Sequence, residues 1–250
     1  QGFREFLENG SVAAAIQNPA PVGCRTCHLI HDTYTATDWE LRITSAFTNN
    51  DGKNMDMTTQ GGDASGNLCA RCHQTRPLSP AITDPTSTTS MLEVTSYRYG
   101  PHHGPQGNML AGIGGFDITG AKYSNSFHTG RIACYDCHAA AAYGKQSGGH
   151  TFKMAYEYHG EMEDNVAGCD VEGCHPGLED FDYDGKQTTI EEKLETLAMK
   201  LQAAGVMDTV DHPGYLVTGT WPQKTLAVWY NYLYILEDRS LGVHNYKQAN

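Results

Sequence analysis

Two segments near the carboxyl end of the chain have the apolar spacing of amphipathic helices. In the first, apolar side chains recur at intervals of four, three and four residues, which places them on one face of a helix. These residues are Ile190, Leu194, Leu197 and Leu201. Two capping boxes fit the start of this helix, Thr188 with Glu191 or Thr189 with Glu192. Gly205 fits its end.

The second helix is predicted from about Trp221-Pro222 to Arg239. One side of it is rich in aromatic residues and is expected to pack on a cofactor or on the protein core. The residues of that side are Trp229, Tyr230, Leu233 and Tyr234. Beyond this helix, Gly242-Val243-His244-Asn245 places a histidine just past a helix terminus.

Strand patterns are weaker and short. Leu41 to Phe47 is strand-like, and apolar residues alternate from Phe152 to Tyr158, although a helix also fits there. Asp51-Gly52 and Gly61-Gly62 are turn signals, and Pro77 to Ser90 is typical of an exposed loop. We therefore expect mainly irregular coil with several α-helices and little β structure.

The amino-terminal segment, residues 1–22, is predicted to be an arm. It holds a short apolar patch, from Phe3 to Ile16, and ends in Pro19 and Pro21. The patch is too small to bury itself, so we expect it to pack on something else. Residues 23–250 are expected to form one unit.

Four pairs of cysteines are each followed at once by a histidine. Cys134-Tyr135-Asp136-Cys137-His138 reads C-x-x-C-H, and the same spacing recurs at 24–28 and 69–73. The fourth, at 169–175, has four residues between its cysteines. C-x-x-C-H is the attachment signature of c-type haem, in which each thiol adds to a vinyl group and the histidine binds the iron. The predicted thioether residues are Cys24, Cys27, Cys69, Cys72, Cys134, Cys137, Cys169 and Cys174, and the predicted proximal ligands are His28, His73, His138 and His175.

The cysteine count favours this interpretation over a disulfide framework or a zinc ribbon. The chain has eight cysteines, and the four pairs use all of them. Neither alternative requires a histidine directly after the second cysteine. Four haems also explain the composition: only 39% of residues are hydrophobic and 27 are glycine, which is thin for an ordinary core, whereas porphyrin faces supply apolar surface.

The remaining histidines can supply the second axial ligands. Of 12 histidines, four belong to the motifs, which leaves eight for four irons. These eight are His31, His102, His103, His128, His150, His159, His212 and His244. Bis-histidine ligation throughout is therefore feasible, and it suits electron transfer rather than substrate binding. The eight methionines are alternative ligands, but none has an obvious presenting context.

Two of the candidate sites have specific constraints. His31 lies three residues after His28, so on a helix the two would share a face and could not bind one iron from opposite sides. As a ligand, His31 would serve a different haem; otherwise it is a surface histidine. In Gly100-Pro101-His102-His103-Gly104, one histidine could bind iron while its neighbour points away, or both could face solvent.

A segment after the fourth motif resembles a calcium loop. Asp180, Asp182 and Asp184, followed by Gly185 and Glu191, fit D-x-D-x-D-G-x₅-E. Two features weaken the fit: Gln187 stands where an apolar residue is usual, and no helix fits between Cys174 and Asp180. The alternative is an acidic helix N-terminus, which the helix dipole favours.

The net charge of −12 predicts an acidic surface. It argues against nucleic acid and anionic membranes as partners and favours a redox protein with a cationic patch. No apolar run reaches the roughly 20 residues of a membrane helix. Because no basic, apolar leader is present, Gln1 is interpreted as a mature N-terminus after export, which predicts an extracellular or periplasmic location.

The chain resembles the secreted multihaem cytochromes of metal-reducing bacteria. The pieces that carry this resemblance are Gly-Pro-His102-His103-Gly-Pro-Gln, His128-Thr-Gly before the third motif, Gly-His150-Thr-Phe-Lys-Met and Asp238-Arg-Ser-Leu-Gly-Val-His244-Asn. Three C-x-x-C-H sites, one C-x₄-C-H site and the C-H-x-x-H of the first are similar, more narrowly, to the OmcE-like tetrahaem filament cytochromes and their OmcS-like hexahaem relatives.

This resemblance implies a haem-organised fold and a head-to-tail homopolymer in which His31 binds a haem of the next subunit. It favours His102 over His103 as a ligand. Three of His102, His128, His150 and His244 would then complete the set, and which one is left out stays open.

Three functions follow as hypotheses. The first is a polymer that conducts electrons outside the cell to minerals or partner cells. The second is a soluble periplasmic shuttle with the same haems. The third is a nitrite or hydroxylamine reductase, which would need an open iron position; the surplus of histidines and the histidine that ends each motif argue against it.

Overall fold

The computed structural model describes residues 2–118 and 122–250. Gln1, on which the prediction of a mature terminus rests, lies outside them. The α-helices are α1 (Gly2–Asn9), α2 (Cys24–Cys27), α3 (Gly66–Ala70), α4 (Gln106–Ala111), α5 (Cys134–His138), α6 (Lys186–Ala203), α7 (Gln223–Asp238) and α8 (Tyr246–Ala249). Four short 3-10 helices are η1 (Ala36–Trp39), η2 (Gly149–Thr151), η3 (Val166–Gly168) and η4 (Tyr183–Gly185).

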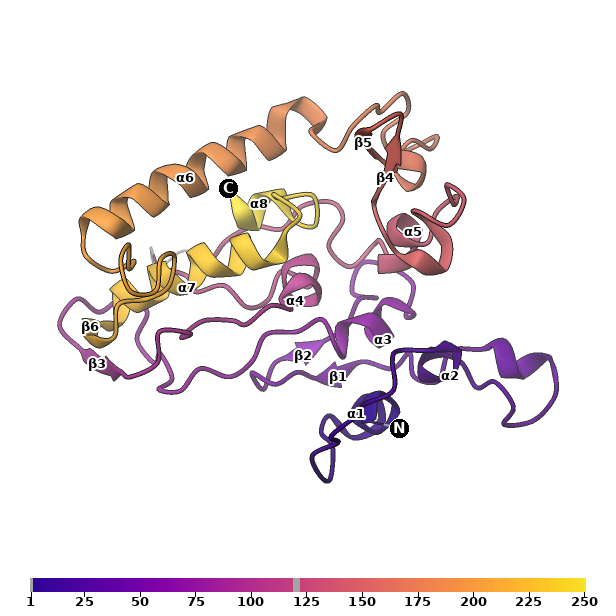
Figure 1. The fold of residues 1–250 in the computed structure, drawn as a ribbon, viewed down its shortest axis with the longest axis horizontal. Coiled ribbons are helices and arrows are strands. Elements are labelled where there is room, and N and C mark those ends of the chain that lie inside the picture. Colours follow the sequence, from indigo (N-terminus) through magenta and orange to yellow (C-terminus); the bar gives the residue numbers. More distant parts are fainter. Residues whose placement is uncertain (1, 119–121) are drawn as a thin grey trace.

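In the described part of the chain, strands form three separate antiparallel pairs. They are β1 (Phe47–Thr48) with β2 (Asn54–Met55), β3 (Met91–Val94) with β6 (Gly219–Pro222), and β4 (Ala155–Tyr158) with β5 (Glu161–Asp164). Figure 1 shows that coil connects most of these elements. The expected mixture of irregular chain, several helices and little β structure is confirmed.

The largest apolar core lies in the carboxyl-terminal part, where α6 and α7 pack together over the β3–β6 pair. The predicted apolar face of α6 is buried at Ile190, Leu194 and Leu201. On α7, Trp229 is fully buried, and its indole N–H donates to the Tyr99 carbonyl oxygen at 2.7 Å. The aromatic side of this helix therefore packs on the core, as one of the two expected alternatives.

The predicted start of α6 is wrong, whereas its predicted end is confirmed. The helix begins at Lys186, and no capping box of Thr188 or Thr189 starts it. Instead, the Asp182 carboxylate accepts hydrogen bonds from the amides of Gln187 and Thr188 and from the Thr188 hydroxyl. At the other end, Gly205 takes a left-handed φ of +70°, which L-residues disfavour and which closes the helix.

The strand predictions are corrected in length. Of residues 41–47 only Phe47 is in a strand, and the Asp51-Gly52 turn connects β1 to β2. Leu41 instead bridges to His28, and the Arg42 amide donates to the Cys27 carbonyl, which ties this segment to the first motif. The strand expected from Phe152 begins at Ala155, because Phe152 has a left-handed φ of +55°.

The amino-terminal arm is only partly packed. Leu7 on α1 is buried, its carbonyl accepts a hydrogen bond from Arg71, and α1 lies beside α2. The other large apolar side chains of the arm include exposed Phe3, Val12, Ile16 and Val22. Across residues 2–118 and 122–250, no helix combines the length and apolarity that a membrane crossing requires.

Candidate functional site

Each cysteine pair is closed by a local turn that ends at its histidine. The His28 amide donates to the Cys24 carbonyl at 2.9 Å, and the His73 amide donates to the Cys69 carbonyl at 3.0 Å. The third motif is the helix α5 itself. Such a turn brings two cysteines and a histidine to one side of the backbone, as attachment to a single porphyrin requires.

The stretched fourth motif closes in the same way. The His175 amide donates to the Cys169 carbonyl at 3.1 Å, although two more residues separate them than in the other motifs. Gly173, with a left-handed φ of +86°, lets the extra residues loop out. The fourth site therefore matches the other three in backbone closure, a similarity that its sequence spacing does not show.

The four motifs follow one another in space in the order of the sequence. Burial raises the pKa of the Cys27 thiol, and the nearby thiol of Cys69 in the second motif raises it further. The thiols of Cys69 and Cys134 interact closely enough to lower the pKa of Cys69 and to raise that of Cys134, which links the second motif to the third.

The third and fourth motifs are also in contact. The thiols of Cys137 and Cys169 interact closely enough to raise the pKa of Cys137 and to lower that of Cys169. Gly168, just before the fourth motif, packs so closely that an added Cβ would lie 2.5 Å from the Asp136 carbonyl oxygen. A glycine at this position therefore permits the close approach.

Three of the four motif histidines each face one histidine from outside the motifs. Two imidazole nitrogens that bind one metal ion from opposite sides, each at about 2 Å, place the ring centroids about 6 Å apart. The pairs, with their centroid separations, are His28–His150 at 6.2 Å, His128–His175 at 6.1 Å and His138–His244 at 6.3 Å. All three centroid separations match the value for two imidazoles on one metal ion.

Hydrogen bonds at Nδ1 fix most of these rings. A carbonyl oxygen can only accept, so a ring nitrogen that contacts one must donate, and Nε2 is then free to bind a metal. The contacts to carbonyl oxygens are His28 to Trp39 at 2.7 Å, His128 to Val243 at 2.8 Å and His138 to Phe152 at 2.9 Å. These backbone acceptors carry no sequence signal, so sequence reasoning could not have found them.

Two further rings use side chains instead. His73 Nδ1 lies 3.1 Å from the Gln106 side-chain oxygen, whose orientation is fixed because the Gln106 amide donates to the Glu237 carbonyl. His244 Nδ1 lies 2.7 Å from the Asp238 carboxylate. Both partners stand inside the sequence pieces that carry the family resemblance, but neither was predicted to contact a ligand.

Electrostatics favour the neutral, metal-binding form at two of these rings. Burial lowers the pKa of His128 and of His138 below that of a free imidazole, although hydrogen bonds to carbonyl oxygens act against it. At His244 burial also lowers the pKa, but the charge and the hydrogen bond of Asp238 together raise it above the ordinary value. His244 is therefore electrostatically distinct from these two half-buried rings.

The remaining motif histidine is His73 of the second motif. It is exposed and has no such ring partner among the described residues. His31 is also exposed, and its ring contact is with Tyr34 at 5.4 Å, not with a motif histidine. The chain therefore presents one motif histidine and one candidate distal histidine that do not meet within it.

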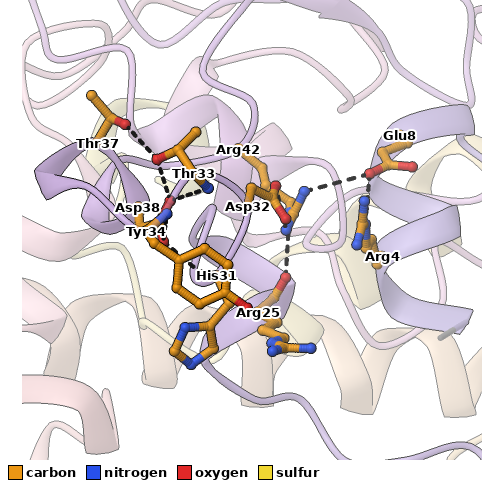
Figure 2. A network of polar contacts seen from close by, with 10 residues as sticks. All are labelled: Arg4, Glu8, Arg25, His31, Asp32, Thr33, Tyr34, Thr37, Asp38 and Arg42. Atoms are coloured by element: carbon orange, nitrogen blue, oxygen red, sulfur yellow. Dashed lines mark hydrogen bonds and ion pairs between the residues drawn. The ribbon is translucent and has the colours of Figure 1, made fainter.

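A buried aspartate holds the loop that carries His31 (Figure 2). Asp38 accepts hydrogen bonds from the amides of His31 at 2.8 Å, Thr33 at 2.8 Å and Tyr34 at 3.0 Å, and from the Thr33 hydroxyl at 2.7 Å. The Thr33 hydroxyl, followed by these amides, lowers the pKa of the Asp38 carboxyl. His31 has a φ of +63°, which is unfavourable for a residue with a Cβ, so this network stabilises a strained presentation of the histidine.

Within the described residues, the other candidate histidines make ring contacts with residues that are not motif histidines. The ring of His102 packs against that of His103 at 4.9 Å, and His103 pairs with Glu237 at 2.8 Å. His159 lies against Tyr158, and His212 stacks on Tyr97 at 4.0 Å. Of the four histidines left open by the resemblance, His102 is thus the one that the structure does not bring to a motif ring.

The structure gives no geometric support to a disulfide framework, to a zinc ribbon or to the predicted calcium loop. No disulfide joins any two of the eight cysteines. Within residues 2–118 and 122–250, no three histidine, cysteine, aspartate or glutamate side chains are grouped as a metal site. Asp182 caps α6, and Asp184 pairs with Lys186 at 2.9 Å. Calcium binding by Asp180, Asp182, Asp184 and Glu191 stays a prediction.

No family model matches the chain, and no curated protein or solved structure matches it significantly.

Proposed function

We propose that the chain is a tetrahaem c-type cytochrome that carries electrons and polymerises head to tail into an extracellular filament. The observation that carries this proposal is the pairing of histidines. Three motif histidines face a second histidine at the separation of axial ligands. Two exposed histidines are left over: His73, a motif histidine that lacks a second ligand, and His31, a candidate second ligand that lacks an iron.

Haem c, when attached, supplies a one-electron redox centre that exchanges electrons without binding substrate. The chain's own residues would hold four such groups through the cysteine pairs and would saturate three irons with His150, His128 and His244. The contacts between successive motifs support one continuous path for electrons, from the first motif to the fourth.

Polymerisation would supply the second axial ligand to the remaining iron, the one at the second motif. His31 of one subunit would bind the iron held by His73 of the next, and a head-to-tail contact that does not close generates an open helix. Exposed apolar side chains in the amino-terminal part of the chain, which also carries His31, support a contact in this region. Within the first 39 residues these are Phe3, Val12, Ile16, Val22, Tyr34 and Trp39.

A matched pair of variants tests this. His31 and His102 are both exposed and both have a left-handed φ, of +63° and +68°. His31→Ala should abolish filaments seen by electron microscopy and leave one haem in four without its second ligand, visible as a high-spin ferric signal. His102→Ala should form normal filaments with four low-spin haems. Normal filaments from His31→Ala would refute the bridging role.

Measurements on the unmodified protein distinguish two other functions, a periplasmic shuttle and a reductase. A monodisperse unmodified protein with four low-spin haems would favour the periplasmic shuttle. The exposed His73 offers an isolated chain one open iron position, which is what a reductase needs. Carbon monoxide binding to one reduced haem in the assembled protein, together with nitrite or hydroxylamine turnover, would favour the enzyme.

A further inference from the structure

The centre formed by His138 and His244 differs from the others in what its rings contact. His244 donates from Nδ1 to the carboxylate of Asp238 at 2.7 Å, whereas the rings of His28, His128 and His138 donate to neutral carbonyl oxygens. At the second motif, the Nδ1 partner of His73 is the neutral amide oxygen of Gln106. Among these contacts, the carboxylate at His244 is the charged acceptor.

The fold fixes this carboxylate in place. Asp238 is the last residue of α7, and its side chain is 1% exposed. The chain then turns back through Arg239, at a φ of +62°, and Leu241, at a φ of +47°. The turn brings His244 against the aspartate six positions earlier.

Ser240 holds both partners at once. Its hydroxyl donates to the second oxygen of the Asp238 carboxylate and accepts a hydrogen bond from the His244 amide at 3.1 Å. The other oxygen of the Asp238 carboxylate is therefore left to accept the hydrogen bond of the His244 ring. A buried carboxylate is costly unless its oxygens are hydrogen-bonded, and this arrangement meets that requirement.

An anionic acceptor changes the donor strength of an imidazole. It draws the Nδ1 proton toward itself more strongly than a carbonyl does, so electron density at Nε2 rises and the ring becomes a stronger ligand. A stronger donor stabilises the ferric over the ferrous ion, and hydrogen bonding to ligands is one of the levers by which proteins set haem potentials.

We propose that Asp238 is a positioning residue that makes the centre of His138 and His244 the most strongly reducing of the four. This inference rests on the proposed function, because it requires haem at the third motif. An electron would then meet an energetic step at this position of the path, and the four centres would not be equivalent.

The test compares the unmodified holoprotein with Asp238→Asn in a spectroelectrochemical titration. Asparagine keeps the size of the side chain and an oxygen acceptor but removes the charge. The lowest of the four potentials should rise, and the near-infrared charge-transfer band of one ferric haem should move toward that of the other three. Asp238→Glu should restore part of the shift.

Asp208→Asn is the matched control, because the Asp208 side chain is only 18% exposed and accepts hydrogen bonds from the amides of Val210 and His212, but it contacts none of the three histidine pairs. It should leave the lowest potential unchanged. A lowest potential unaltered in Asp238→Asn, or altered equally in Asp208→Asn, would overturn the inference.

If Asp238→Asn does not fold, the near-infrared spectrum of the unmodified protein still tests the inference. Four ferric haems with identical near-infrared bands would overturn the inference, whereas one distinct band, lost when Cys134 and Cys137 are both replaced by serine, would support it. A chain that binds no haem would instead refute the proposed function, so the two failures are distinguishable.

Discussion

The carboxyl-terminal helices and the motif region solve the problem of burial in different ways. Around α6, α7 and the β3–β6 pair, side chains form a continuous apolar core. By contrast, residues 122–189, all of which the structure describes, bury one hydrophobic side chain, Ala133. That stretch holds two cysteine motifs and several of the paired histidines instead.

The difference teaches where the folding free energy of each region must come from. Buried apolar area contributes about 25 cal/mol per Å², so a region that buries little needs another source of stability. Covalently attached porphyrins, each held by an iron between two histidines, would provide it. In this interpretation the left side of Figure 1 is organised by side chains and the right side by cofactor.

The largest expected effect comes from withholding the cofactor. Protein produced without haem attachment should lose ordered structure in residues 122–175, because no apolar cluster stabilises them, while α6 and α7 stay protected. Hydrogen exchange followed by mass spectrometry measures this difference directly. Equal protection of both regions in the haem-free chain would break the comparison.

An intermediate effect is expected from the helical core. Trp229→Ala removes a fully buried side chain and its hydrogen bond to Tyr99, so it should destabilise the fold by about 3–5 kcal/mol. Its control is Trp39→Ala, since Trp39 is 70% exposed and its loss should change stability little. Denaturant unfolding measures both. Haem content should remain at four in each variant, because neither side chain contacts a paired histidine.

The smallest expected effect is the loss of helix stability at the start of α6 when the pH is lowered. The Thr188 hydroxyl, with the amides of Thr188 and Gln187, lowers the pKa of Asp182 below its ordinary value. The stabilisation is therefore complete above the usual aspartate pKa, about 3.9, and is lost as the pH falls through the lower folded value. Circular dichroism between those limits should show α6 weakening.

Replacement of the capping residue checks the origin of that pH dependence. Asp182→Asn can still cap the helix but does not titrate, so the acid-dependent part should disappear. Asp180→Asn should leave it, because Asp180 contacts the Asp182 amide and none of the first amides of α6. Loss of the pH dependence in both variants would point to a shared charge, such as a bound calcium ion.

Much of the fold was predictable where the signal is local. The apolar spacing of α6, its end at Gly205 and the extent of α7 to within about two residues follow from the sequence. The start of α6 was missed because Asp182, outside the predicted helix, supplies the hydrogen bonds that a capping box would have made. The strand at 41–47 was overestimated because Leu41 and Arg42 bond to the first motif.

By itself the sequence determined the four cysteine motifs, the histidine that each one carries and the surplus of further histidines. Adjacent residues specify these features, so spacing along the chain is enough. Tertiary structure alone decided which of the further histidines faces which motif histidine, that the His102 ring faces none among the described residues, and that Asp238 meets His244. Partners such as His28 and His150 are distant in the chain, and only packing of the whole fold brings their rings to a separation that one iron can bridge.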